Sequence, residues 1–183
     1  MSQPSRRYER SNRGMLAALL VVVVGVAAFV GVRGLLSTNT ATPVQTVDYH
    51  GWVKSGRDDG KLLILAPQPM PSGWRATSVT YATGTAPRWH LGMLTDQGRY
   101  VGLEEQWASP SEMVQQFVDA NAVRGKAVRI AGRSWRVWTD SGGDYALVNT
   151  RPSKVKDHPE SIVVVGDAPP EQIRRFVASL SRH

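Results

Sequence analysis

The pattern of apolar and polar positions divides the chain into two unequal parts. Residues Met15–Val32 form an uncharged apolar run of 18 residues that ends at Arg33. A helix of that length spans about 27 Å, close to the roughly 30 Å hydrocarbon thickness of a bilayer. From Asp48 onward the apolar positions come in short periodic groups instead. The pattern therefore predicts a membrane-spanning helix followed by a folded domain.

These patterns set the limits of four segments. We expect a basic cytoplasmic tail over 1–14, a transmembrane helix over 15–36, a spacer over 37–47 and an extracytoplasmic α+β domain over 48–183. Basic residues before the apolar run place the N-terminus in the cytoplasm by the positive-inside rule. Cleavage of the apolar run as a signal peptide is the alternative. A retained anchor is favoured, because the run is long for a signal-peptide core.

Strand-like stretches dominate the domain. Alternating, β-branched and aromatic residues predict strands over 74–81, 89–95, 99–107, 127–131, 134–139, 145–150 and 161–165. The turn Asp96-Gln97-Gly98 joins the second and third of these as a hairpin. The expected fold is an α+β domain with a mostly antiparallel, twisted sheet and about two helices that cover one face.

The two predicted helices both begin with proline. Ser109-Pro110-Ser111-Glu112 fits a capping box, and the helix is expected to end near Asn121, with Gly125 marking its exit. The second helix opens at 167–171. Its apolar positions recur at i, i+3, i+4 and i+7, namely Ile173, Phe176, Val177 and Leu180.

Two earlier stretches are harder to assign. Residues 48–60 contain three glycines and the turn signal Asp58-Asp59-Gly60, so no helix is expected there. The apolar run Lys61–Leu65 fits a buried strand or a packed helical turn.

Charge and cysteine content exclude several classes of function. The net charge is +7, but five of the 22 Lys and Arg residues and one of the 15 Asp and Glu residues precede Gly34, which leaves the rest of the chain at only +3. The high charge therefore reflects mainly the membrane flank, and no nucleic-acid partner is expected. The chain has no cysteine, so disulfides, thiol catalysis and cysteine-ligated zinc are excluded.

No catalytic constellation is evident in the sequence. None of the four histidines has a metal-ligand spacing, and no phosphate loop or serine-nucleophile motif occurs, so no metal or cofactor is expected. Glu104 and Glu105 should point to opposite faces of their strand and cannot form a carboxylate pair. His90 lies mid-strand, where a structural role is favoured over that of a catalytic base.

The chain contains six tryptophans, which is many for its length. Core packing is favoured for most of them, but aromatic rows on a sheet can also bind ligands. The candidate ligand or interaction face consists of Trp74, Trp89, His90, Trp107, Trp135 and Trp138. The spacing of Trp135 and Trp138 is odd, so they should face opposite sides of the sheet.

The second half of the domain is rich in basic residues, including Arg124, Lys126, Arg129, Arg133 and Arg136. Outside a membrane, the matching polyanions are lipid headgroups and acidic envelope polymers. An ordinary solvated sheet face is the alternative and is favoured.

Several motifs together resemble domain-of-unknown-function family 4245, a family of uncharacterised actinobacterial membrane-anchored proteins. The resemblance rests on Ala66-Pro67, Pro71, Gly73–Ser78, Trp89–Gly92, Tyr100–Glu104, Gly132–Trp135 and Ile162–Gly166, and it covers roughly residues 10–182. It implies an envelope location and supplies no catalytic residue.

The sequence favours a non-enzymatic, single-pass membrane protein that is anchored in the bilayer through Met15–Val32. Its extracytoplasmic domain would bind an envelope protein, a lipid or an anionic polymer. One alternative is a lipid or small-molecule carrier, which the surplus of aromatic residues suggests. The other is an envelope hydrolase that uses His90 with a carboxylate distant in sequence.

Overall fold

The computed structural model describes residues 44–153 and 159–182. The predicted tail, the predicted membrane span and most of the predicted spacer lie outside the described residues. Within the part of the chain that is described, no helix is long and apolar enough to cross a membrane. Residues Val44–His183 form one compact unit. Both hydrophobic clusters and all the strands given below lie inside it.

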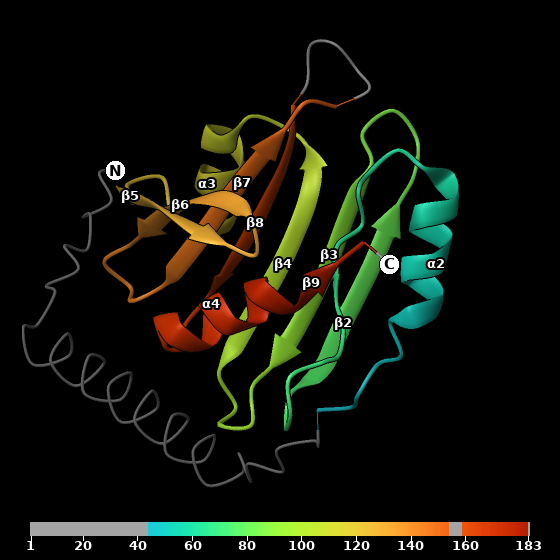
Figure 1. The fold of residues 1–183 in the computed structure, drawn as a ribbon, viewed down its shortest axis with the longest axis horizontal. Coiled ribbons are helices and arrows are strands. Elements are labelled where there is room, and N and C mark those ends of the chain that lie inside the picture. The colour runs from blue at the N-terminus through green and yellow to red at the C-terminus, as the bar shows by residue number, and fades with distance from the viewer. Residues whose placement is uncertain (1–43, 154–158, 183) are drawn as a thin grey trace, which may run out of the picture. The chain divides into compact units, whose positions relative to one another are not determined.

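Seven strands form one antiparallel sheet in the order β2-β3-β4-β8-β7-β6-β5 (Figure 1). They are β2 (Arg75–Ala82), β3 (Arg88–Leu94), β4 (Tyr100–Trp107), β5 (Val123–Ile130), β6 (Arg133–Thr139), β7 (Tyr145–Arg151) and β8 (Glu160–Gly166). The strand β8, which comes last in the chain among these seven, lies between β4 and β7 and joins two meanders into one sheet. The α+β class, the antiparallel sheet and the seven predicted strands are confirmed, although β5 begins earlier than expected.

Helices pack on both faces of this sheet. The helix α3 (Pro110–Phe117) packs over β7 and β8 against Ala146, Val148, Val163 and Val165. The helix α4 (Pro170–Ser179) packs on the opposite face, where Leu147, Ile162 and Val164 belong to the larger cluster. Successive strand residues point to opposite faces, so the consecutive apolar positions of β7 and β8 bury both sides. The prediction of two helices on one face was therefore wrong.

A third helix, α2 (His50–Asp59), precedes the sheet in a stretch where none was expected. Its C-cap is Gly60 at φ 66°, so the glycine that signalled a turn ends a helix instead. Gly56 lies inside the helix, where a Cβ would come within 2.9 Å of the Ile64 side chain. This close approach favours glycine at that position despite its low helix propensity. The expectation that 48–60 is not helical was wrong.

The start of α3 is confirmed and its end is not. The Ser109 hydroxyl accepts a hydrogen bond from the Glu112 N–H at 3.3 Å, and the Ser109 N–H donates to the Glu112 carboxylate at 2.8 Å. These two bonds are the predicted capping box. The helix ends at Phe117 rather than near Asn121, and Gly125 lies within β5.

The apolar run Lys61–Leu65 is neither a strand nor a helical turn. It is an irregular, largely buried segment that leads into β1 (Ala66–Pro67). The strand β1 pairs with β9 (Leu180–Ser181). Its amides donate to two buried carboxylates, Leu63 to Glu160 at 2.7 Å and Leu65 to Glu105 at 2.5 Å. Buried acidic side chains thus satisfy backbone donors that a sheet neighbour would otherwise satisfy.

Candidate functional site

The structure does not bring the six candidate residues of the sequence analysis together. Trp89 and Trp135 are fully buried in the larger cluster, and Trp107 is partly buried against it. The Trp89 indole N–H donates to the Leu65 carbonyl at 3.1 Å. Trp138 packs against the smaller cluster on the opposite face, as the odd spacing from Trp135 predicted. Trp74 lies partly buried, stacked on Phe176 at 5.5 Å between ring centroids.

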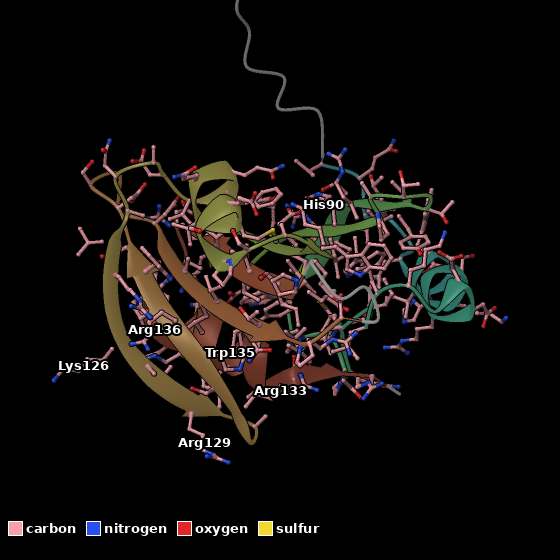
Figure 2. The ribbon with its side chains drawn as sticks, turned by 90° about the horizontal axis from the view of Figure 1, so that it is seen from above. His90, Lys126, Arg129, Arg133, Trp135 and Arg136 are labelled. Carbon is pink, nitrogen blue, oxygen red and sulfur yellow. The ribbon has the colours of Figure 1, made fainter. Side chains whose placement is uncertain are left out.

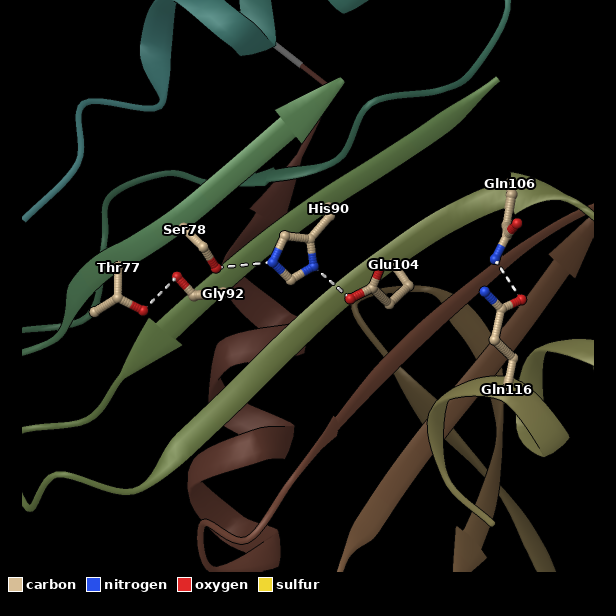
Figure 3. A network of polar contacts seen from close by, with 7 residues as sticks. All are labelled: Thr77, Ser78, His90, Gly92, Glu104, Gln106 and Gln116. Carbon is tan, nitrogen blue, oxygen red and sulfur yellow. Dashed lines mark hydrogen bonds and ion pairs between the residues drawn. The ribbon is translucent and has the colours of Figure 1, made fainter. Parts of the chain in front are cut away.

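His90 lies on the α3 face of the sheet, in line with two polar side chains from neighbouring strands (Figure 3). Its Nδ1 lies 2.5 Å from Glu104 Oε1 on β4, and its Nε2 lies 2.8 Å from Ser78 Oγ on β2. The antiparallel register places His90 directly opposite Glu104 and, on its other side, directly opposite Thr80. We call Ser78, His90, Tyr100 and Glu104 the His90 cluster.

The electrostatics of this cluster depend on its burial. The Glu104 residue is only 8% exposed, and burial raises the pKa of its carboxyl, against the opposing effect of the hydrogen bond with His90. That hydrogen bond raises the pKa of His90, against the effect of its own partial burial. Both pKa shifts favour a proton held between the imidazole and the carboxyl.

Two glycines make room for the cluster. Gly92 and Gly102 lie opposite each other on β3 and β4. A Cβ on Gly92 would overlap Ser78 Oγ and would lie 3.2 Å from both His90 Nε2 and the Tyr100 hydroxyl. A Cβ on Gly102 would lie 2.9 Å from the same Tyr100 hydroxyl. The missing side chains therefore let three polar atoms converge above the sheet.

A cavity of about 390 Å³ opens beside this cluster, between β2, β3, β4 and the C-terminal end of α3. It is lined by Thr80, Ala82, Arg88, His90, Glu104, Gln116 and Phe117. Gln116 also receives a hydrogen bond from Gln106 on β4 at 3.2 Å, which ties α3 to this half of the sheet. Small molecules therefore have space next to the His90–Glu104 pair.

On the other side of α3 lies a cleft of about 460 Å³, which we call the basic cleft. It is lined by Pro110, Ser111, Arg124, Ala127, Ser134, Arg136, Trp138, Val148 and Thr150. The registers of β5, β6 and β7 align Arg124 with Trp138 and align Ala127, Arg136 and Val148 in the next row. Two guanidinium groups thus lie beside an indole ring and small apolar side chains.

The basic residues of this cleft have no acidic partner among the described residues. None of the ion pairs between described residues includes Arg124 or Arg136, and Arg136 Nη1 donates only to the Gly125 carbonyl, at 3.3 Å. The Trp138 indole N–H is buried without a hydrogen-bond partner there. Lys126 and Arg129 project away from the same hairpin (Figure 2) and do not line the cleft.

Two further cavities flank Trp74 on the α4 face. One, of about 560 Å³, is bounded by Tyr49, Pro67, Met70 and Ala76 among others. The second, of about 480 Å³, lies between the proline-rich segment 69–71 and α4, beside Gln172 and Phe176. Of the six candidate residues, Trp74, Trp138 and His90 therefore line cavities, whereas Trp89, Trp107 and Trp135 line none of those described above.

Sequence reasoning missed Ser78 and Tyr100, and it did not pair Glu104 with His90. A signal for the last of these was present, because His90 and Glu104 are equally distant from Gln97 at the centre of the predicted turn. The opposite orientation of Glu104 and Glu105 is confirmed, since they bond to His90 and to the Leu65 amide. Among the described residues, no group of three or more His, Cys, Asp or Glu side chains is placed to hold a metal ion.

The comparisons with known proteins show only the family to which this chain belongs. No curated protein matches the chain. A sequence profile described as "Protein of unknown function (DUF4245)" matches residues 7–180, which is most of the chain. The motifs Gly73–Ser78, Trp89–Gly92 and Tyr100–Glu104, on which the resemblance rests, are the segments that meet in the His90 cluster. With a match of this extent, the chain belongs to the DUF4245 family of proteins of unknown function.

Proposed function

We propose that this chain is a single-pass membrane-anchored envelope protein whose extracytoplasmic domain binds an anionic ligand in the basic cleft. The apolar run Met15–Val32 and the basic residues before it support the anchor and its orientation. The observation that carries the binding proposal is the pair Arg124 and Arg136, which lies beside Trp138 in a cleft of about 460 Å³.

The chemistry of the cleft favours phosphate or carboxylate groups on a partly apolar ligand. Guanidinium groups donate several hydrogen bonds in a planar fork that matches those anions. Ser111, Ser134 and Thr150 add hydroxyl groups to the lining of the cleft. Trp138, Ala127 and Val148 offer apolar surface to the rest of such a molecule.

Calorimetric titration of the full chain in a nonionic detergent tests this proposal, with sodium tripolyphosphate as the anionic probe and trehalose as the neutral one. Each hydrogen bond to a charged group is worth about 1.5–3 kcal/mol, so each lost arginine should weaken binding at least tenfold. We expect Arg124→Gln with Arg136→Gln to abolish measurable binding. We expect binding to weaken as salt is added.

The matched control is the pair Lys126→Gln and Arg129→Gln, which removes the same charge from the same hairpin outside the cleft. The proposal requires this control to bind almost as well as the unaltered chain. Equal losses in the two double variants would instead show a diffuse charge effect. Absence of any binding to tripolyphosphate by the unaltered chain would contradict an anion site in this cleft.

A second candidate function is the carriage of a small apolar molecule. The observation that favours it is the cavity of about 560 Å³ beside Trp74, because Tyr49, Pro67, Met70 and Ala76 line much of it. Native mass spectrometry of the chain should then show a bound molecule that Trp74→Ala releases. A chain that carries no such mass from any expression host would count against this function.

A further inference from the structure

The alignment of Ser78, His90 and Glu104 has the order of a nucleophile, a base and an acid that orients the base. The Glu104 carboxylate lies at Nδ1 of His90, so it favours the tautomer that carries its proton there. Nε2 is then the lone-pair nitrogen, and it lies 2.8 Å from Ser78 Oγ. This geometry lets the imidazole accept the hydroxyl proton of Ser78.

The surroundings keep this geometry in place. The Glu104 side chain is 11% exposed and that of His90 is 28% exposed, so packing limits both rotations while the ring stays reachable. The three residues lie on adjacent paired strands of the sheet rather than on loops. Side chains on such rigid elements hold a reactive geometry better than side chains on loops do.

Tyr100 is the fourth residue of the cluster. Its hydroxyl and His90 Nε2 both lie 3.2 Å from the point that a Cβ on Gly92 would occupy, and Ser78 Oγ overlaps that point. Burial raises the pKa of Tyr100, so its hydroxyl keeps its proton and remains a donor. An oxyanion is stabilised by a donor that lies near the carbonyl oxygen of the ester, and the Tyr100 hydroxyl is the donor available on this side of Ser78.

We propose that Ser78, His90, Tyr100 and Glu104 form a serine acyl-transfer site that cleaves small carboxylic esters. Ser78 Oγ bonds to the ester carbonyl carbon while its proton passes to His90 Nε2. The Tyr100 hydroxyl donates a hydrogen bond to the carbonyl oxygen as that oxygen becomes negative. The carbon–oxygen bond to the alcohol then breaks, and the alcohol leaves with the proton from His90.

Water completes the reaction. A water molecule gives one proton to His90 and adds its oxygen to the acyl carbon on Ser78. The acyl–Ser78 bond breaks, the carboxylic acid leaves, and Ser78 Oγ regains the proton from His90. The cavity of about 390 Å³ is lined by His90 and Glu104 and not by Ser78 or Tyr100, so it offers room for one chain of the ester on the far side of the imidazole, between apolar walls formed by Phe117 and Ala82.

The experiment uses the purified full chain in a nonionic detergent, with p-nitrophenyl acetate as substrate and a fluorophosphonate as the serine-directed probe. We expect ester cleavage, and we expect mass spectrometry to place the probe on Ser78. Ser78→Ala should abolish both signals. His90→Asn should lower the rate of ester cleavage by a factor of about 10²–10⁴, which is the usual contribution of general base catalysis. Tyr100→Phe should lower kcat more than it raises KM.

Glu104 acts as a positioning residue, because it bonds to His90 and not to the ester. Glu104→Gln removes the carboxylate whose hydrogen bond and charge raise the pKa of His90, so the acid limb of the pH–rate profile should move to lower pH. A merely structural role would lower the amount of folded protein without moving that limb. Ser55→Ala, at an exposed serine of α2 outside both the relay and the cavity, is the control and should keep its activity.

Two results would overturn the assignment. One is a fluorophosphonate that modifies other serines and leaves Ser78 untouched in the folded chain. The other is a Ser78→Ala variant that cleaves the ester as fast as the unaltered chain and has the same far-ultraviolet circular dichroism spectrum. Neither result depends on Arg124 or Arg136, so this proposal and the anion-binding proposal are tested independently of each other.

Discussion

Glu105 allows the sharpest test of the packing described above, because it is a carboxyl in a fully buried position. Its Oε1 accepts the Leu65 N–H at 2.5 Å, whereas Oε2 has no hydrogen-bond partner among the described residues. Burial is the largest cause that raises the pKa of Glu105, to about 8 from 4.5. The nearby carboxylate of Glu160 also raises the pKa, while the Leu65 N–H and Arg151 lower it.

The sign of the effect on stability follows from proton binding. Between pH 4.5 and about 8 the folded chain keeps the Glu105 proton and the unfolded chain releases it. The folded state therefore binds more protons, and the contribution of Glu105 to the free energy of unfolding falls as pH rises through this range. One pKa unit corresponds to about 1.4 kcal/mol, so the full loss is on the order of 5 kcal/mol by pH 8.

Glu105→Gln removes the titration while it keeps the side chain's size and an oxygen for the Leu65 amide. We expect the variant to match or slightly fall below the unaltered chain near pH 5 and to be more stable by several kcal/mol near pH 8. Urea unfolding of residues 44–183, followed by tryptophan fluorescence at several pH values, measures the difference. Glu171→Gln, at an exposed position in the first turn of α4, is the control. A difference between Glu105→Gln and the unaltered chain that stays constant from pH 5 to pH 8 would refute the reasoning.

Three further substitutions test other parts of the structure by the same unfolding assay. Ser109→Ala removes the capping box of α3 and should cost about 1 kcal/mol, and Ser109→Asp should restore most of it. Phe176→Ala removes a fully buried ring stacked on Trp74 and should cost about 3–5 kcal/mol, whereas the exposed neighbour Arg175→Ala should change little. Gly166→Ala should prevent folding, because its Cβ would overlap the backbone carbonyl of Tyr100 across the central strand pair, and soluble, stable Gly166→Ala protein would contradict the register of β4 and β8.

The strands and the start of α3 could be predicted from local patterns. Alternation and turn signals mark all seven strands of the sheet, and Ser109 with Glu112 marks the capping box. Local patterns failed at α2, because Gly56 is required there by contact with Ile64, a residue in a different segment. Local patterns also failed to predict which face of the sheet each helix covers. The strands β7 and β8 are apolar on both sides and therefore do not specify that face.

For the candidate sites, too, local patterns predict some features, while others depend on tertiary contacts. The basic hairpin and Trp138 could be identified from composition and spacing, but the cleft depends on α3 lying beside β6 and β7, which is a tertiary contact. The pairing of His90 with Glu104 was not predicted, although the predicted turn at 96–98 implies it. The approach of Ser78 is not implied by that turn, because a loop from Thr83 to Pro87 and a register shift between Ala76 and Ser78 set its position.

The anion-binding proposal is tested most directly by a nitrogen–proton NMR titration of isotope-labelled residues 44–183 with tripolyphosphate. We expect saturable shifts of the Trp138 indole N–H and of the amides of Arg124, Ala127 and Arg136, with little change at the Trp89 and Trp135 indoles in the core on the opposite face of the sheet. Shifts that spread evenly over Lys126, Arg129 and other exposed basic residues, with the Trp138 indole unmoved, would contradict it.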